Sequence, residues 1–238
     1  MTTDVSRSTA AKRPVGRPRA NGKPHLTKAQ IFQVAASLIT QYGYGGTSLR
    51  MIASQLDASP ASILNAFSNK EALLNALIEY AAGAAFTFYQ QLRAKQLAPD
   101  VALYKSLYEE AYAVADNPDF AALFYLPELN RPQFSNAQQV RENMLRHYEG
   151  LLRKGQKAGI FLRLPITHTA EQLFQLTETS ILSLPTKQAP HPKTQAQAAA
   201  DFCLRAILVK PEELPNVKQA AAQIELSFVP PAQALSRT

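Results

Sequence analysis

Residues 47–67, TSLRMIASQLDASPASILNAF, contain two short helical patterns that are joined by a tight reversal. Thr47 suits the cap of the first helix, and Asp57 stands where the chain reverses. Ser59 suits the N-cap of the second helix, and Pro60 suits its first position. Isolated helices shorter than about 12 residues are marginal in water. The stretch therefore predicts two helices that stabilise each other through a shared core.

A longer helical pattern precedes this stretch. Thr27 and Gln30 form a capping box at its start, and Gly43 provides its C-terminal stop. Ser68 and Glu71 form a second capping box, which opens a long fourth helix. The first three helices can bury one small core, which would consist of Ile31, Leu38, Leu49, Ile52, Ala53, Ile63 and Phe67.

This arrangement would leave one face of the third helix, about residues 60–66, free to enter the major groove of DNA. An asparagine there can bond a base edge or a phosphate, and small apolar side chains can touch a thymine methyl group. The exposed face would carry Pro60, Ala61, Ser62, Leu64 and Asn65.

The positive charge of the chain is concentrated at its amino-terminal end. The 238 residues carry a net charge of +7, and residues 1–70 hold nine basic against two acidic residues. The remainder is neutral overall, so the pattern predicts a polyanion-binding end joined to a neutral body. A basic tail that is merely solvated is the alternative.

Residues 1–24 lack periodicity, and we expect them to form a disordered basic arm. Within the arm, Gly16-Arg17-Pro18-Arg19 is an extended basic strip that fits a narrow A·T-rich minor groove. It resembles the core of an AT-hook, although Val15 stands where an arginine is usual. The alternative role of Arg17 and Arg19 is non-specific attraction to phosphates.

The body is predicted to be helical throughout, because alanine, leucine and glutamine dominate it and apolar residues recur at helical spacing. Helices are expected at about residues 101–115, 118–126, 134–158, 168–184 and 194–209, with a Pro-rich linker at 186–193 and a short helix near 216–226. The fold class is therefore all-α. We assign residues 1–24 to the arm, 25–70 to the helix-turn-helix domain and 71–238 to a larger helical bundle domain.

Residues 26–80 resemble the DNA-binding domain of TetR-family transcriptional regulators. The resemblance lies in the Tyr-Gly end of the first helix, the Thr-Ser start and internal Ile-Ala of the second, the Ser-started third, and the Phe-Ser-x-Lys-Glu junction with the fourth. It implies a sequence-specific regulator, usually a repressor, that binds a palindromic operator. The positions that would touch DNA are Thr47, Ser48, Pro60, Ala61, Ser62, Leu64, Asn65 and Lys70.

Two residues depart from the family pattern. Asp57 replaces the usual glycine of the turn, and Leu64 replaces a tyrosine that reaches a phosphate. Lys70 would bind a phosphate together with the N-terminus of the fourth helix.

The resemblance also implies a homodimer and a small-molecule effector. The dimer seam would use Leu173, Leu176, Ile181 and Leu184 with Ala198, Phe202, Ala206 and Val209, unless these stripes pack within one chain. A mostly apolar effector would bind among helices 71–160. Its candidate contacts are Phe86, Tyr89, Tyr108, Tyr112, Phe124 and His147, and Tyr104, Phe120 and Tyr148 are further candidates for the pocket wall. For each of these residues the alternative is that it only packs in the core.

We expect no catalysis, metal or cofactor, because the four histidines are scattered and no catalytic motif or phosphate-binding loop occurs. Cys203 is the only cysteine, and its apolar surroundings predict a buried, inert thiol. No export signal or uninterrupted run of about 18 apolar residues is present, so we expect a cytoplasmic protein without a membrane span. An architectural DNA-binding protein without a ligand and a helical enzyme with a vestigial head are the competing classes.

Overall fold

The computed structural model describes residues 26–177 and 191–228. These residues are all-helical, apart from one isolated antiparallel bridge between Phe161 and Leu208, so the predicted all-α class is confirmed. The α-helices are α1 (Lys28–Gly46), α2 (Leu49–Gln55), α3 (Pro60–Ala66), α4 (Lys70–Ala94), α5 (Pro99–Asp116), α6 (Pro118–Ala122), α7 (Ser135–Lys157), α8 (Ile166–Thr177), α10 (Pro192–Ile207) and α11 (Leu214–Ala222). Four short 3-10 helices are η1 (Leu123–Tyr125), η2 (Pro127–Asn130), η3 (Pro132–Phe134) and η4 (Pro211–Glu213).

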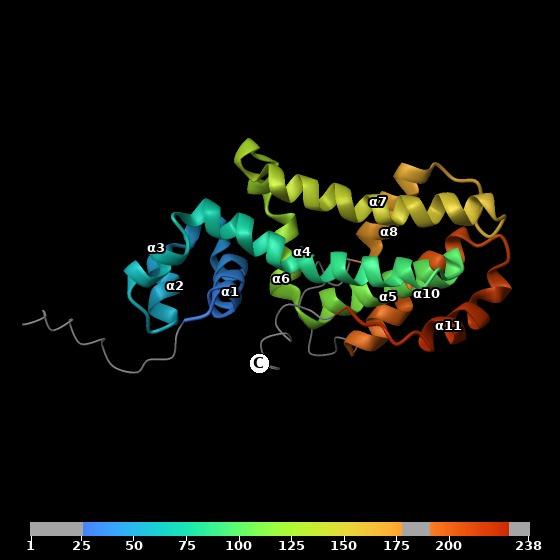
Figure 1. Cartoon of the computed structure of the whole chain (residues 1–238), viewed down its shortest axis with the longest axis horizontal. Helices are drawn as coiled ribbons and strands as arrows, with labels where there is room; N and C mark the ends of the chain where they lie inside the picture. Colours follow the sequence, from blue (N-terminus) through green and yellow to red (C-terminus); the bar gives the residue numbers. More distant parts are fainter. Residues whose placement is uncertain (1–25, 178–190, 229–238) are drawn as a thin grey trace, which may run out of the picture.

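Helices α1, α2 and α3 form a small head at one end of the molecule, and α4 runs from this head into the larger helical body (Figure 1). The apolar residues predicted for the head meet in its core: Ile31, Ile52, Ala53, Ile63 and Phe67 are buried, and Leu38 and Leu49 are partly buried against them. The short helices thus gain from packing the stability that they lack alone.

Two helix caps lie one residue later than predicted. Ser48, not Thr47, is the N-cap of α2, and its hydroxyl accepts the Met51 N–H at 3.2 Å. Asn69, not Ser68, caps α4 by accepting the Ala72 N–H at 2.7 Å. Thr47 is unavailable as a cap because its buried hydroxyl donates to main-chain oxygens at the end of α1.

The reversal between α2 and α3 lies at Asp57, as the sequence predicts, and uses a left-handed backbone conformation. Asp57 has a φ of 48°, a conformation that aspartate tolerates better than most residues other than glycine. The Ala58 N–H donates to the Ala53 carbonyl at 2.9 Å, and the Asp57 N–H donates to the Ser54 carbonyl at 3.2 Å. This pair of bonds is a Schellman motif, which ends α2 and turns the chain into α3.

Helix α4 is the central element of the fold. Ten of its residues are buried, and they serve the head at one end and the body at the other. Its length and composition alone would allow it to cross a membrane, but half of its most apolar window is buried against neighbouring helices. That burial is what the core helix of a globular protein shows.

The helices of the body begin and end close to their predicted positions. Helices α5 and α7 match the predicted segments within two residues, and the predicted 118–126 helix divides into α6 and η1. Helix α8 begins at Ile166, and the rest of its predicted extent, to residue 184, lies outside the described residues. Helix α10 begins within the predicted linker, because Pro192 occupies its first turn and the His191 side chain accepts the Lys193 N–H at 3.3 Å.

Gly155, near the end of α7, makes a close contact with the segment that leads to α8, and only glycine permits this contact. Gly155 is buried, and a Cβ atom there would lie 2.1 Å from the ring of Phe161, which is itself buried. The main chain after α7 is joined to the end of α10, where the Leu162 N–H donates to the Ile207 carbonyl at 2.8 Å. The packing of Phe161 on Gly155 therefore fixes where α7, α8 and α10 meet.

We predict that Gly155→Ala lowers the free energy of unfolding by roughly 1–3 kcal/mol, because the ring of Phe161 must move out of a filled site. The matched control is Gly150→Ala on the same helix, where an added Cβ meets nothing within 4 Å. That change should raise stability by about 0.5–1 kcal/mol through helix propensity. Chemical denaturation measures both, and equal effects from the two variants would contradict the prediction.

Candidate DNA-binding surface and ligand cavity

The outer face of α3 is exposed to solvent in the part of the chain that the structure describes. Ile63 and Phe67 turn inward and are buried, and the predicted contact residues around them are all exposed: Pro60, Ala61, Ser62, Leu64 and Asn65. Leu64 exposes 51% of its surface, which is unusual for a large apolar side chain in a packed head. Ser48, at the start of α2, is exposed as well.

The first turn of α3 is fixed by its own serines. The Ser59 hydroxyl accepts the Ser62 N–H at 3.1 Å, and the two hydroxyl oxygens lie 2.8 Å apart. Pro60 occupies the first helical position, where its missing N–H costs nothing. The exposed face is therefore presented by a helix whose start has little conformational freedom.

Thr47 and Lys70 occupy the interior of the head and not its outer face. The Thr47 hydroxyl donates to the carbonyls of Leu38 and Gly43 at 3.1 and 3.0 Å. The Lys70 ammonium donates to the carbonyls of Tyr44 and Thr47 at 2.7 and 2.9 Å and lies 4.2 Å from the Tyr44 ring centroid.

These hydrogen bonds hold together the two sides of the break in α1 at Gly43, where φ is 72°. A side-chain contact from Thr47 to DNA does not fit its burial, and the Lys70 ammonium is already bonded within the head. Both residues therefore serve to position α2 and α3. The other two predicted contacts, Arg17 and Arg19, lie in the arm, outside the described residues.

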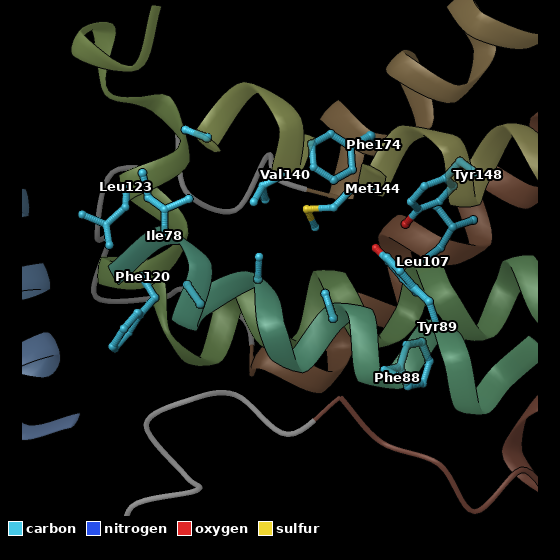
Figure 2. Close-up of a cluster of buried hydrophobic side chains, with 14 of the residues drawn as sticks. Ile78, Phe88, Tyr89, Leu107, Phe120, Leu123, Val140, Met144, Tyr148 and Phe174 are labelled. Carbon is cyan, nitrogen blue, oxygen red and sulfur yellow. The ribbon is translucent and has the colours of Figure 1, made fainter. Parts of the chain in front are cut away.

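A cavity of about 70 Å³ lies in the body between α4, α5, α6, α7 and α8. By the usual allowance of ~10–15 Å³ for each water, it holds on the order of five water molecules. Its walls are mostly apolar, and Figure 2 shows Met144 and Phe174 side by side in this region. The lining consists of Ala81, Ala82, Ala85, Glu110, Ala113, Val114, Asn117, Phe120, Ala121, Phe124, Met144, Phe174, Thr177 and Phe228.

Only part of the predicted ligand set meets this cavity. Phe124 and Phe120 line it, whereas Tyr89, His147 and Tyr148 lie behind Glu110. Phe86, Tyr108 and Tyr112 are not among its lining residues, and Tyr108 instead borders a separate surface hollow with Tyr104. An aromatic repeat at helical spacing does not show which side of a helix faces a cavity.

Glu110 is the polar group that the prediction missed. Its carboxylate accepts hydrogen bonds from the hydroxyls of Tyr89 and Tyr148, the latter at 2.6 Å. These two hydroxyls converge from α4 and α7 in Figure 2. The sequence carries a signal for this position, because Glu110 continues the apolar stripe of Leu103, Leu107 and Val114 on α5.

Burial dominates the ionisation of this cluster. It raises the pKa of Glu110 to about 8, although the bond from Tyr148 acts in the opposite direction. Burial also lowers the pKa of His147 to about 3, and Arg93 and Lys154 add to this effect. His147 stacks on Tyr89 with ring centroids 3.8 Å apart, and its Nε2 lies 2.8 Å from the Ser106 hydroxyl.

A row of aromatic rings joins the cavity to the head. Phe120, in the cavity wall, lies 6.4 Å from Tyr80, Tyr80 lies 4.9 Å from Phe32, and Phe32 lies 5.5 Å from Phe67, all between ring centroids. Phe67 is the residue that ends α3. Head and body also meet where the Thr40 hydroxyl donates to the Asp119 carbonyl at 3.4 Å.

The predicted dimer stripes differ between the two helices. The predicted residues Ala198, Phe202 and Ala206 on α10 and Val209 just after it are all exposed, and Phe202 exposes 64% of its surface. On α8, Leu173 is buried within its own chain, so its assignment to an intermolecular seam is wrong. Leu176 is partly buried, and Ile181 and Leu184 lie outside the described residues.

Among the described residues, no group of three or more histidine, cysteine, aspartate or glutamate side chains is arranged to hold a metal ion. Cys203 is buried, and burial raises its pKa to about 12. The thiol is therefore a packing group, as its apolar surroundings in the sequence indicate.

Comparison with known proteins identifies the class. Residues 31–77, which include all of α2 and α3, match the model described as "Bacterial regulatory proteins, tetR family". Residues 31–77 are therefore a DNA-binding domain of the tetR-family type, and the resemblance inferred from the sequence is confirmed for this part of the chain. No curated protein matches the chain in sequence.

Solved structures share the fold over 75–81% of the chain. A tetR-family regulatory protein from Rhodococcus RHA1 has a TM-score of 0.65 at 23% identity and covers 76% of this chain and 96% of its own. The ketosteroid transcriptional regulator KstR2 of Mycobacterium tuberculosis has a TM-score of 0.67 at 16% identity, covering 81% of this chain and 100% of its own. The regulator FadR from Bacillus subtilis, in complex with stearoyl-CoA, has a TM-score of 0.61 at 18% identity, covering 75% and 98%. At these identities the likeness establishes the fold.

We predict that Lys70→Met lowers the free energy of unfolding of the head by roughly 1–3 kcal/mol, because two charge-assisted hydrogen bonds to main-chain oxygens are lost. Methionine keeps the packing on Tyr44. The control is Lys28→Met, whose ammonium lies 6.0 Å from the Phe67 ring and should matter by less than about 0.5 kcal/mol. Thermal denaturation compares them, and a Lys70 variant as stable as the control would contradict the positioning role.

Proposed function

We propose that this protein is a cytoplasmic transcriptional repressor that binds a palindromic operator as a homodimer and is released by a small, mostly apolar ligand. The observation that carries the proposal is the exposed face of α3, held on a rigid head that matches the tetR family model. The cavity in the body supports the ligand, and the exposed stripe on α10 supports the dimer.

The proposed DNA contacts are sorted by their chemistry. Asn65 bonds a base edge or a phosphate, and Ala61 and Leu64 touch thymine methyl groups. The hydroxyls of Ser48 and Ser62 donate to the phosphate backbone and the Pro60 ring packs against it, which positions the head without reading sequence. Arg17 and Arg19 of the arm reach the adjacent minor groove.

The proposed dimer uses α10. Its inner face is filled by contacts within the chain, including Ala200, Cys203 and Leu204, and the described residues leave its outer stripe exposed. An apolar stripe of this kind suits a second copy of the same helix, since a two-fold axis pairs identical surfaces. Two heads related in this way read two half-sites about one helical turn apart.

The proposed release mechanism is a shift in population. A ligand in the cavity displaces Phe120, and the contacts of Phe120 with Tyr80 and of Tyr80 with Phe32 carry the change to α3. A differential affinity of a few kcal/mol between the two conformations is sufficient. The cavity as it stands is far smaller than a steroid nucleus or a long acyl chain, so we propose a compact effector in place of the ligands that the names of KstR2 and FadR indicate.

We predict that Ala61→Glu weakens operator binding by about tenfold or more, because a carboxylate is placed against DNA. The helix should remain folded, since Ala61 is exposed and lies in a first turn that favours acidic residues. The control, Gln91→Glu, adds the same charge at an exposed position far along α4. An operator selected from random duplexes provides the assay. Unchanged affinity in the Ala61 variant would exclude this face as the reading surface.

We predict that removing residues 1–24 weakens binding to the same operator and reduces the dependence of log Kd on log salt, because fewer phosphates lose their counterions. Titrations at several salt concentrations measure the slope. The double variant Arg17→Gln, Arg19→Gln tests the strip without shortening the chain. An unchanged slope in both proteins would show that the arm makes no contact. A protein that binds all duplexes alike would be architectural and not a regulator.

A further inference from the structure

Glu110 is an acidic group at the edge of an otherwise apolar cavity. Only 4% of its surface is exposed, and the described residues that line the cavity with it include no lysine, arginine or histidine. The nearest charged neighbours on α5 are occupied, since Lys105 pairs with Glu109 at 2.8 Å. Arg141 lies against the Phe174 ring at 5.4 Å but is not part of the lining. An ionised carboxylate here would have no partner cation among the described residues.

The hydrogen bonds of Glu110 nevertheless suit its ionised form. Each of its two oxygens accepts from a tyrosine hydroxyl, one from Tyr89 and the other from Tyr148. A protonated carboxyl also carries one O–H donor, so that proton would need a third partner unless one of the two tyrosine bonds were reversed. Burial opposes ionisation and raises the pKa to about 8. The site is thus arranged for a carboxylate and lacks only a positive charge to stabilise it.

The rest of the lining suits the body of such a cation. Phe120, Phe124, Phe174 and Phe228 all border the cavity. Aromatic faces attract ammonium groups, and this attraction is strongest where water is excluded. The alanines of α4 and α5 keep the remaining wall smooth and apolar.

We propose that the cavity binds a compact organic cation, a small amine or quaternary ammonium compound of about five heavy atoms, whose positive charge pairs with Glu110. This inference builds on the proposed function, because it names the chemical class of the effector. Binding the cation favours loss of the Glu110 proton and leaves both tyrosine bonds in place.

Calorimetry with the full-length protein, in the absence of DNA, tests the site. The probes are tetramethylammonium and tert-butanol, which have five heavy atoms each, are nearly the same size and differ in charge. The cation should bind about tenfold tighter or more. Glu110→Gln should remove this preference while the neutral probe binds as before. The control Glu149→Gln removes a carboxylate that pairs with Arg153 outside the cavity, and it should leave the preference intact.

The affinity for the quaternary cation should rise with pH by up to about tenfold per unit below pH 8 and then level off, because Glu110 must be ionised. The groups that face this site from other helices are Tyr89 on α4, His147 and Tyr148 on α7, and Cys203 beside Tyr148 on α10. Burial moves the pKa of His147 to about 3, that of Cys203 to about 12, and that of Tyr148 well above its usual value. The pH dependence should vanish in Glu110→Gln.

Operator binding separates the two proposals. Equal affinity for the charged and neutral probes, or a preference that survives Glu110→Gln, would overturn the cation site. If the neutral probe alone released the operator, the proposed effector response would stand and the cation would be wrong. If the cation bound through Glu110 without changing operator affinity, the site would stand and the proposed release would fail. Thermal denaturation of Glu110→Gln checks that the variant is folded.

Discussion

The continuity of α4 is the constraint on which the molecule depends. One end of this helix begins with Lys70, whose ammonium closes the end of α1, and its middle carries the alanines that line the cavity. No loop separates the head from the body, so a change in the body reaches the head through an element that transmits rotation and translation. The side chain of Tyr80, halfway along, contacts both parts.

The fold was largely predictable because local signals agreed with one another. Serines at helix starts, Pro60 in the first turn of α3 and a left-handed Asp57 each specify the same helix-turn-helix, and the buried residues of the head follow from its periodicity. The cap of α2 was predicted one residue too early, because the Thr47 hydroxyl can bond either within α2 or to the main chain of α1. This hydroxyl satisfies carbonyl oxygens left open where α1 breaks at Gly43, and only the tertiary structure brings these into reach.

The candidate sites were less predictable. The exposed face of α3 follows from a period of 3.6 residues, and the structure places its residues as expected. The ligand set was harder, because Tyr108 and Tyr112 share a helix with Glu110 but not its direction. The prediction omitted Glu110 because it was built on the aromatic residues alone, although a carboxylate within an apolar stripe is the rarer event. Leu173 was wrongly assigned to a seam because an apolar stripe is the same whether its partner is in the same chain or another.

The row of rings from Phe120 to Phe67 crosses α4 at a single residue, and this has a consequence for how the chain can change over evolution. An α-helix turns by about 100° for each residue, so inserting or deleting one residue between Tyr80 and Lys70 would swing the Tyr80 ring out of the row. The head and the body could each still fold, but Tyr80 would no longer connect Phe120 in the cavity wall to Phe32 in the head. A substitution in this segment leaves the direction of Tyr80 unchanged, whereas a change in the length of the segment does not.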